Sequence, residues 1–339
     1  MTTPTYLPCG LTNLGNTCFL NSCIQLLNYT YEIEDVPLPD DCQTDEQRVF
    51  RDWRELRTFM MGARGQMTNP VVTPGKFIHT VHEVAKIKGR DIFTGWAQND
   101  LPEFLLFMIE CMHNSRKRSV TMQINGSSET TTDDLAFECY SMIKEDYKRG
   151  DYSEFSELFN GIYVSRLFTP DSVILHSNKP EPYCLLDLPI PPLTSRISLQ
   201  DCFDTFVADE LLSGWFNEKT NRNEPVRKNI AFWNFPKILI ITLKRYSPDG
   251  LYKNNALIDF PLDNLDLSKY VIGYKAKTYK YKLFGVANHM GSVSGGHYTA
   301  FVLTGETQKW HCFNDATVSE MGEEQVVSSS AYCLFYRKY

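Results

Sequence analysis

Apolar residues in the first half of the chain recur at helical spacing. Leu20, Cys23, Ile24 and Leu27 follow the i, i+3, i+4, i+7 pattern that places side chains on one face of an amphipathic helix. Similar patterns predict further helices over residues 48–61, 74–87 and 101–112. Asp100 is a suitable N-cap for the last of these helices. The first half is therefore expected to be mainly helical.

Apolar residues in the second half form short runs typical of strands. Residues 238–243 (ILIITL) are rich in β-branched side chains and predict a buried strand. Further strand candidates lie at residues 282–287, 297–303, 309–313 and 331–336. The polar stretches 125–134 and 215–225 are typical of a loop and a turn. Helices followed by strands predict an α+β fold with two lobes, and a cleft between lobes is a common place for an active site.

Composition and charge narrow the class of protein. The 339 residues include 34 Lys and Arg against 41 Asp and Glu, and the net charge of -7 argues against nucleic-acid binding and favours a basic partner. No run of about 18 apolar residues occurs, and the N-terminus has no basic segment followed by an apolar one. We therefore expect neither a membrane-spanning helix nor a secretory signal. The ten cysteines contain no CxxC pair and indicate reduced thiols in a cytoplasmic or nuclear protein.

One cysteine lies where a helix would make it reactive. Residues 10–22 (GLTNLGNTCFLNS) form a loop that runs into the first predicted helix, so Cys18 lies at or beside a helix N-terminus. Unpaired N–H groups and the helix dipole stabilise a thiolate there, which predicts a lowered pKa. The same N–H groups, with the side-chain amide of Asn13, can stabilise an oxyanion after attack on a carbonyl. The alternative is a buried, unreactive thiol, the commoner state of a free cysteine.

A histidine near the other end of the chain supplies a candidate base. His297 follows two glycines and opens a predicted strand, so its ring could project into a cleft. A Cys–His pair needs a third group to orient the imidazole, and Asn314 or Asp315 can accept the required hydrogen bond. Taken alone, His297 is weak evidence, because a hydrogen-bonded structural histidine is commoner. His289 is a second candidate base, but no orienting residue follows it, so we place it in the cleft without that role.

Together these segments resemble the ubiquitin-specific proteases, a family of cysteine deubiquitinases. Residues 10–22 resemble the family's cysteine box, and residues 282–336, with GGHYTAF and WHCFNDATV, resemble its histidine box. Residues 98–104 (QNDLPEF) are similar to the family's Gln-Gln-Asp-x-x-Glu-Phe segment, with Asn99 in place of the second Gln. Residues 236–246 (PKILIITLKRY) are similar to its strand ending in Leu-Lys-Arg-Phe. The matches follow the family's order over nearly the whole chain.

The resemblance implies a papain-like α+β fold, with one catalytic domain filling residues 1–339. Its expected regions are a helical thumb over roughly residues 10–145, and β-sheet fingers and palm over roughly residues 150–339. The implied activity is thiol-dependent hydrolysis of the isopeptide bond after the C-terminal glycine of ubiquitin. The implied partners are ubiquitin and ubiquitinated proteins, with no nucleic acid, no membrane insertion and a monomeric enzyme. The alternatives are a catalytically inactive ubiquitin-binding scaffold and a protease for a ubiquitin-like modifier.

The resemblance also assigns catalytic roles residue by residue. Cys18 matches the nucleophile, His297 the general base and Asn314 the third member of the triad. Asn13 matches the oxyanion donor, and Asp315 matches an adjacent acid that assists or replaces Asn314.

Other positions match residues that bind the substrate. Asp100 and Glu103 match acids that contact the Arg-bearing tail of ubiquitin, which fits charge complementarity. Tyr298 matches an aromatic residue that flanks the narrow tail channel. Gly295 and Gly296 leave room for a Gly-Gly tail to approach the backbone.

The metal content expected of the chain departs from the family pattern. Many members bind zinc in their fingers through two CxxC pairs. Residues 165–171 and 215–225 contain no cysteine, so we expect no zinc and no other cofactor, with packing or hydrogen bonds holding the fingers together. His79 and His82 have ligand-like spacing, but no third ligand accompanies them, and we interpret them as exposed helical histidines.

Overall fold

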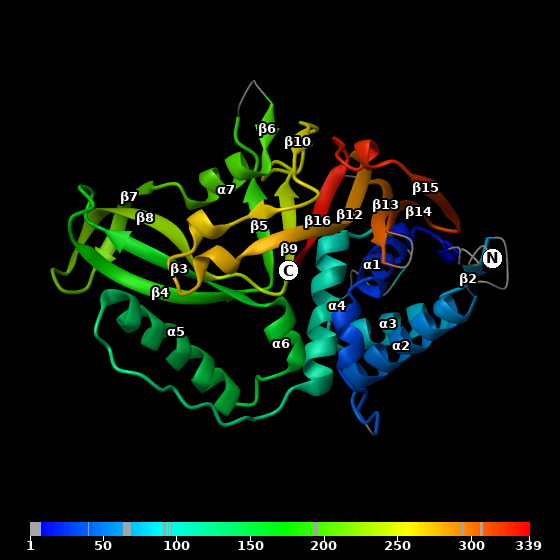
Figure 1. Ribbon diagram of the computed structural model, residues 1–339, viewed down its shortest axis with the longest axis horizontal. Helices are drawn as coiled ribbons and strands as arrows, with labels where there is room; N and C mark the ends of the chain where they lie inside the picture. The colour runs from blue at the N-terminus through cyan, green and yellow to red at the C-terminus, as the bar shows by residue number, and fades with distance from the viewer. Residues whose placement is uncertain are drawn as a thin grey trace.

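The molecule consists of a helical lobe, a central β-sheet that lies against this lobe, and a second β-sheet at the other end of the longest axis (Figure 1). The structure, a computed structural model, describes residues 8–39, 41–63, 69–90, 93, 95, 97–192, 196–292, 295–305 and 308–339. Among the helices described, none combines the length and the apolar character that a membrane span requires.

The helices lie mainly in the first half of the chain. They are α1 (Cys18–Asn28), α2 (Asp45–Ala63), α3 (Gly75–Ile87), α4 (Leu101–Arg116), α5 (Thr131–Lys148), α6 (Glu154–Phe159) and α7 (Leu199–Val207). Helices α1 to α4 confirm the four helices predicted from apolar spacing. Helix α5 was not predicted. Thr130 and Asp133 form a capping box at its start, so the loop expected over residues 125–134 is wrong for its last part.

The central sheet collects the strands of the second half. They are β5 (Leu185–Pro189), β9 (Ile238–Lys244), β11 (Leu265–Asp266), β12 (Lys280–Ser292), β13 (Gly295–Thr304), β14 (Lys309–Asn314), β15 (Thr317–Met321) and β16 (Ala331–Lys338). Their order is β15-β14-β13-β12-β16-β9-β5, with β11 paired to β12, and all neighbours are antiparallel except β5 and β9. The five predicted strands are confirmed within this sheet, which corresponds to the palm.

The second sheet extends away from the helical lobe, with α5 beneath it in Figure 1. Its strands are β3 (Gly161–Phe168), β4 (Leu175–Tyr183), β7 (Glu210–Asn217) and β8 (Arg222–Asn234), antiparallel in the order β4-β3-β8-β7. The stretch 215–225, expected to be a turn, is instead the tip of the β7–β8 hairpin, with strand on both sides of residues 218–221. Two short parallel pairs are β1 (Gly10–Leu11) with β2 (Val71–Val72), and β6 (Ile197–Ser198) with β10 (Ile258–Asp259).

Side-chain hydrogen bonds link the strands of the second sheet, which corresponds to the expected fingers. Asp209 accepts from Arg227 Nη1 at 2.9 Å and from Asn229 Nδ2 at 2.7 Å. Arg166 Nε donates to Asn229 Oδ1 at 2.9 Å, and Arg227 Nη2 donates to the Pro170 carbonyl at 3.0 Å. These contacts join β3 and β8 to the segments that flank β4 and β7. They are hydrogen bonds of the kind expected to hold the fingers together.

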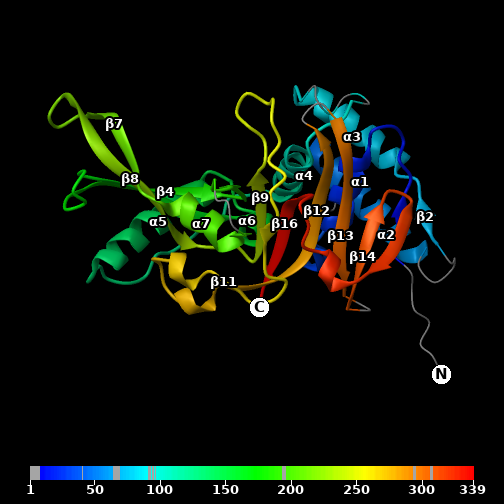
Figure 2. The same ribbon diagram turned by 90° about the horizontal axis from the view of Figure 1, so that it is seen from above.

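Helix α1 lies beside strand β13 of the central sheet (Figure 2). Strand β13 and helix α4 both pack against it, and all of its residues are buried. The expectation of a one-faced amphipathic helix is therefore wrong, because its polar residues Asn21, Gln25 and Asn28 are also covered. Buried amides must find hydrogen-bond partners, so this helix is a place where polar contacts are specific.

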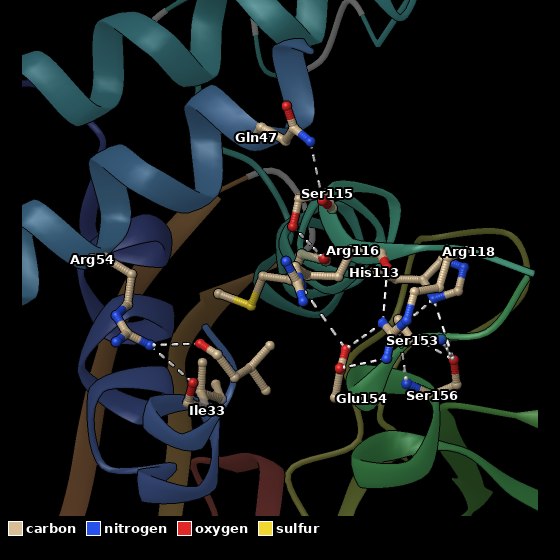
Figure 3. Close-up of polar contacts among 12 residues, drawn as sticks. Ile33, Gln47, Arg54, His113, Ser115, Arg116, Arg118, Ser153, Glu154 and Ser156 are labelled. Carbon is tan, nitrogen blue, oxygen red and sulfur yellow. Dashed lines mark hydrogen bonds and ion pairs between the residues drawn. The ribbon is translucent and has the colours of Figure 1, made fainter. Parts of the chain in front are cut away.

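Polar contacts join the helical lobe to the start of the fingers through α6 (Figure 3). His113 Nδ1 on α4 lies 2.8 Å from the Ser153 hydroxyl, and Arg118 Nη2 donates to the Glu154 carboxylate at 2.8 Å. Ser153 is also the N-cap of α6, where it forms a capping box with Ser156. These contacts fix α6 against the end of α4, and strand β3 begins directly after α6. The limit expected between thumb and fingers, near residue 145, falls inside α5 and stays a prediction.

Candidate active site

Helix α1 begins at Cys18 and presents this residue to strand β13. Only 3% of Cys18 is exposed. The backbone N–H of Tyr298, the residue directly after His297, is close enough to the Cys18 sulfur to favour its thiolate form. The N-cap residue Thr17 makes no capping hydrogen bond with its side chain in the described structure. The fold thus brings a sulfur from the start of the chain to the strand that carries the candidate base.

Burial raises the pKa of the Cys18 thiol above its ordinary value, and the negative charge of Asp315 also raises it. The backbone N–H groups of Tyr298 and Phe19 act in the opposite direction without offsetting the burial. The prediction of a lowered pKa is therefore wrong, because desolvation of a buried thiolate outweighs the helix-end N–H groups. At neutral pH Cys18 is mainly a neutral thiol, and a base must take its proton during the reaction.

The raised pKa predicts slow alkylation of Cys18 at neutral pH. Because only the thiolate reacts, the rate of modification by iodoacetamide should keep rising beyond about pH 8.5, the ordinary pKa of a cysteine. Mass spectrometry of the peptide that contains Cys18 measures this rate, with the half-buried Cys42 in the same digest as a reference. A rate that levels off below pH 7 would indicate a preformed thiolate–imidazolium pair and would contradict the neutral thiol described above.

His297 and Asn314 meet at the ends of two paired strands. Phe313 on β14 pairs with Ala300 on β13. The next residue, Asn314, therefore falls beside Thr299, and His297 lies two residues further along the same face. The ring Nε2 of His297 is 2.7 Å from Asn314 Oδ1. With Nε2–H donating to Asn314, the lone pair of the ring is on Nδ1, which is the atom able to accept a proton.

Asp315 lies beside the same ring but is held by other groups. Its Oδ2 is 4.0 Å from His297 Nε2, beyond hydrogen-bond distance, and accepts from Asn13 Nδ2 at 2.9 Å. Its Oδ1 accepts from Asn21 Nδ2 at 2.7 Å. The geometry therefore favours Asn314 as the group that orients His297, with Asp315 as a neighbouring negative charge.

Asn13 is fixed by both ends of its side-chain amide. Its Oδ1 accepts from the backbone N–H groups of Gly15 at 2.9 Å and Thr17 at 3.2 Å, while its Nδ2 donates to Asp315. An amide nitrogen carries two hydrogens, and these contacts use one of them. The structure thus places Asn13 next to the start of α1, and its role as an oxyanion donor stays a prediction.

His289 lies in the cleft as a neutral side chain. Its Nδ1 is 2.5 Å from the Tyr246 hydroxyl and 3.1 Å from Lys253 Nζ. Burial, together with the positive charge of Lys253 and the nearby His297, lowers the pKa of His289 to about 4. Because the ammonium of Lys253 can only donate, Nδ1 of His289 is an acceptor and is already occupied. Lys253 was not predicted from the sequence, since a single lysine in a loop carries no signal.

A cleft of about 340 Å³ opens beside Cys18. Its lining residues come from α1, the segment before α4, the end of β9 and the β12–β13 pair: Cys18, Phe19, Gln98, Asn99, Asp100, Tyr246, His289, Ser292, Gly295, Gly296 and Tyr298. Gln98 had no predicted role, yet its amide makes two hydrogen bonds to the Gly296 backbone, at 2.8 and 3.0 Å. A Cβ at Gly296 would lie 2.3 Å from His289 Nε2, so the strand pair itself requires this glycine. Its role toward a substrate tail, like that of Gly295, stays a prediction.

Asp100 and two tyrosines form a hydrogen-bonded group beside the cleft. Asp100 Oδ1 accepts from the backbone N–H of Glu103 at 3.2 Å, which confirms Asp100 as the N-cap of α4. Its Oδ2 accepts from the hydroxyls of Tyr332 at 2.9 Å and Tyr298 at 3.3 Å. Burial raises the pKa of the Asp100 carboxyl. Asp100 therefore has a structural role, whereas Glu103 is exposed on the first turn. The substrate contacts expected of Asp100, Glu103 and Tyr298 stay predictions.

Replacing Asp100 with alanine should lower the free energy of unfolding by about 1–2 kcal/mol, because α4 loses its N-cap and two tyrosine hydroxyls lose an acceptor. Urea denaturation monitored by fluorescence measures the change. Glu103→Ala is the control on the same turn, and it should change the free energy of unfolding by less than about 0.5 kcal/mol. Equal losses in the two variants would contradict the structural role of Asp100.

The histidines with ligand-like spacing lie on α3 as expected. The His79 side chain is 73% exposed and its Nδ1 lies 3.8 Å from Glu83. Burial lowers the pKa of His82, which is partly covered and not fully exposed as expected. In the part of the chain that the structure describes, no group of three or more His, Cys, Asp and Glu side chains is arranged to hold a metal ion.

An α+β fold that combines a cysteine at a helix start with a histidine held by an asparagine, on the strand against which that helix packs, is typical of the papain-like class of proteins. The chain belongs to the ubiquitin carboxyl-terminal hydrolase family, whose model matches residues 9–336. Ubiquitin carboxyl-terminal hydrolase Usp2 of Drosophila melanogaster is 32% identical, over 97% of this chain and 35% of that protein. Ubiquitin carboxyl-terminal hydrolase 2 of Homo sapiens is 32% identical, over 96% of this chain and 54% of that protein.

The fold is shared with a solved structure of the SAGA Ubp8/Sgf11/Sus1/Sgf73 DUB module bound to ubiquitin aldehyde. The TM-score is 0.70 and the sequence identity 21%, over 98% of this chain and 70% of that one. The papain-like α+β prediction is thereby confirmed. The present chain spans only about a third to a half of the length of the relatives named above.

Proposed function

We propose that this chain is a thiol-dependent deubiquitinase, which hydrolyses the isopeptide bond after the C-terminal glycine of ubiquitin. One observation carries the proposal: Cys18 opens the helix that packs against β13, close to Tyr298, and the preceding residue on β13, His297, has its ring 2.7 Å from Asn314. Family membership supports the choice of ubiquitin as the modifier. Ubiquitin and ubiquitinated proteins are the proposed partners. The cytoplasm or the nucleus is the proposed location, because all ten cysteines are free thiols.

The reaction begins with a proton transfer, since the resting thiol is neutral. Nδ1 of His297 takes the proton of Cys18, and the thiolate attacks the carbonyl carbon of the ubiquitin C-terminal glycine. His297 then gives this proton to the leaving lysine amine, the C–N bond breaks and a thioester remains on Cys18. His297 next takes a proton from water, the hydroxide attacks the thioester, and ubiquitin leaves with a free carboxylate as the thiol is restored.

Groups around Cys18 provide the other functions that the proposed reaction needs. The first N–H groups of α1, with Asn13, stabilise the oxyanion that forms on the glycine carbonyl. Asn314 holds His297 in the tautomer whose Nδ1 accepts the proton. The glycines at the cleft keep side chains away from the backbone, which suits a tail that ends in two glycines, and Glu103 offers a carboxylate to a basic residue of that tail.

A comparison of tail substrates tests the proposal. The purified chain should release aminomethylcoumarin from ubiquitin–aminomethylcoumarin at least about ten times faster than from the same fluorophore on a ubiquitin-like modifier, measured as kcat/KM. A covalent ubiquitin–vinyl probe should label Cys18. Faster release from the ubiquitin-like modifier would show that this modifier, and not ubiquitin, is the preferred substrate. Ubiquitin binding without hydrolysis or labelling would show an inactive scaffold.

A further inference from the structure

Three side-chain amides follow one another along the buried helix α1. Asn21, Gln25 and Asn28 are each no more than 2% exposed. In each of them the amide nitrogen donates a hydrogen bond, while the oxygen has no hydrogen-bond partner among the described atoms. Burying an unpaired oxygen is unfavourable, so these residues are not explained by apolar packing. The role of each amide is therefore indicated by the group to which its nitrogen donates a hydrogen bond.

Asn21 differs from the other two because its nitrogen binds a charged group of the active site. Its Nδ2 is 2.7 Å from Asp315 Oδ1, whereas the carbonyl oxygens of Thr12 and Leu11 lie at 3.4 and 3.5 Å. A bond to a carboxylate at this distance is a strong, charge-assisted hydrogen bond. Gln25, one turn further along α1, donates instead to the Cys9 carbonyl at 2.8 Å.

The bond from Asn21 determines where the other oxygen of Asp315 points. With Oδ1 held by Asn21, Oδ2 accepts from Asn13 at 2.9 Å and lies 4.0 Å from His297 Nε2. Asn21 is three residues after Cys18, so both are rigidly fixed in the first turn of α1. The helix that carries the nucleophile thus also carries the donor that orients this carboxylate.

We infer that Asn21 is a positioning residue for the reaction. It holds the Asp315 carboxylate so that Oδ2 stays in place to accept from Asn13, and so that its negative charge stays 4.0 Å from His297 Nε2. This inference rests on the proposed function, since it names a further residue of the same site. Asn21 touches none of the reacting atoms, and its effect passes through Asp315.

Steady-state kinetics with ubiquitin–aminomethylcoumarin tests the inference on the whole chain. Asn21→Leu removes the donor, and Asn21→Asp places a second carboxylate against Asp315. Both should lower kcat about 10–100-fold while KM stays within about twofold, because the tail-binding cleft is unchanged. Gln25→Leu is the matched control, since it removes an equally buried amide from the same helix, and its kcat should stay within about twofold of the wild type.

A swapped pair separates positioning from a general loss of stability. The double variant Asn21→Asp/Asp315→Asn restores a donor opposite a carboxylate, and its kcat should exceed that of Asn21→Asp about tenfold. A kcat within twofold of the wild type for Asn21→Leu, or an equal loss in Gln25→Leu, would overturn the inference. Failure of the swap to recover any activity would also count against it.

A structural readout keeps the inference testable apart from the proposed function. If the wild-type chain does not hydrolyse ubiquitin, the proposed function fails, but crystal structures still test Asn21. In the wild type the Asn13 Nδ2 to Asp315 Oδ2 hydrogen bond should be present, as at 2.9 Å here. In Asn21→Leu, or in Asn21→Ser if the leucine variant does not fold, that distance should exceed 3.5 Å. An unmoved carboxylate would overturn the positioning role.

Discussion

Replacing Cys18 with alanine is expected to abolish hydrolysis of ubiquitin–aminomethylcoumarin, with a loss of at least about 10⁴-fold in kcat. The reaction needs an atom that can form and release a thioester, and alanine offers none. The fold should persist, because Cys18 is a small buried side chain and the substitution removes a single sulfur atom. Release of the fluorophore and thermal unfolding of the same preparation measure the two effects.

Cys23 provides the control for this prediction. It is a second buried cysteine on α1, and burial raises the pKa of its thiol well above the ordinary value. Cys23→Ala should therefore keep kcat within about threefold, although the small cavity should cost some stability. Substantial activity in Cys18→Ala, or an equal loss in Cys23→Ala, would show that Cys18 is not the nucleophile.

Replacing His297 with alanine is expected to lower kcat about 10³-fold, the usual scale for the loss of a general acid–base. The effect should be large in this protein because burial keeps Cys18 protonated, so the attacking thiolate depends on a base. KM should change little, since the ring acts on the reacting atoms. Steady-state kinetics at several pH values measures the change, and the remaining activity should rise with pH as hydroxide replaces the missing base.

His289→Gln tests whether the right histidine has been assigned. The His289 ring is held by Tyr246 and Lys253 and is neutral at pH 7, so a neutral amide can replace much of its contact. We expect a loss of less than about tenfold in kcat. A larger loss for His289→Gln than for His297→Ala would move the base to His289 and overturn the mechanism.

Local signals in the sequence predicted much of the fold. Asp100 was identified as the N-cap of α4 because capping depends on residues within one turn. The buried strand at residues 238–243 was evident from its β-branched run. Helix α5 and the β7–β8 hairpin were not predicted, because their polar residues lack a clear apolar period and their pairing depends on distant strands.

In the active site too, short motifs predicted some residues, whereas others could be found only from contacts with distant parts of the chain. Cys18 at a helix start follows from a short motif, and Asn314 as the partner of His297 follows from the family resemblance; the structure places both residues as predicted. Gln98 and Lys253 were found only from their contacts with residues nearly 200 and about 36 positions away, respectively. No local pattern gives the structural role of such residues, since their partners are brought to them by folding.

The sequence by itself determined the family and the candidate reacting groups, because both depend on which residue types occur in which order. The tertiary structure alone decided the state of those groups. It buried Cys18 and so raised its pKa, the reverse of the expectation from the helix end, and it oriented Asp315 through an amide on α1. Protonation and orientation depend on desolvation and on partners supplied by distant parts of the chain, which a linear motif does not contain.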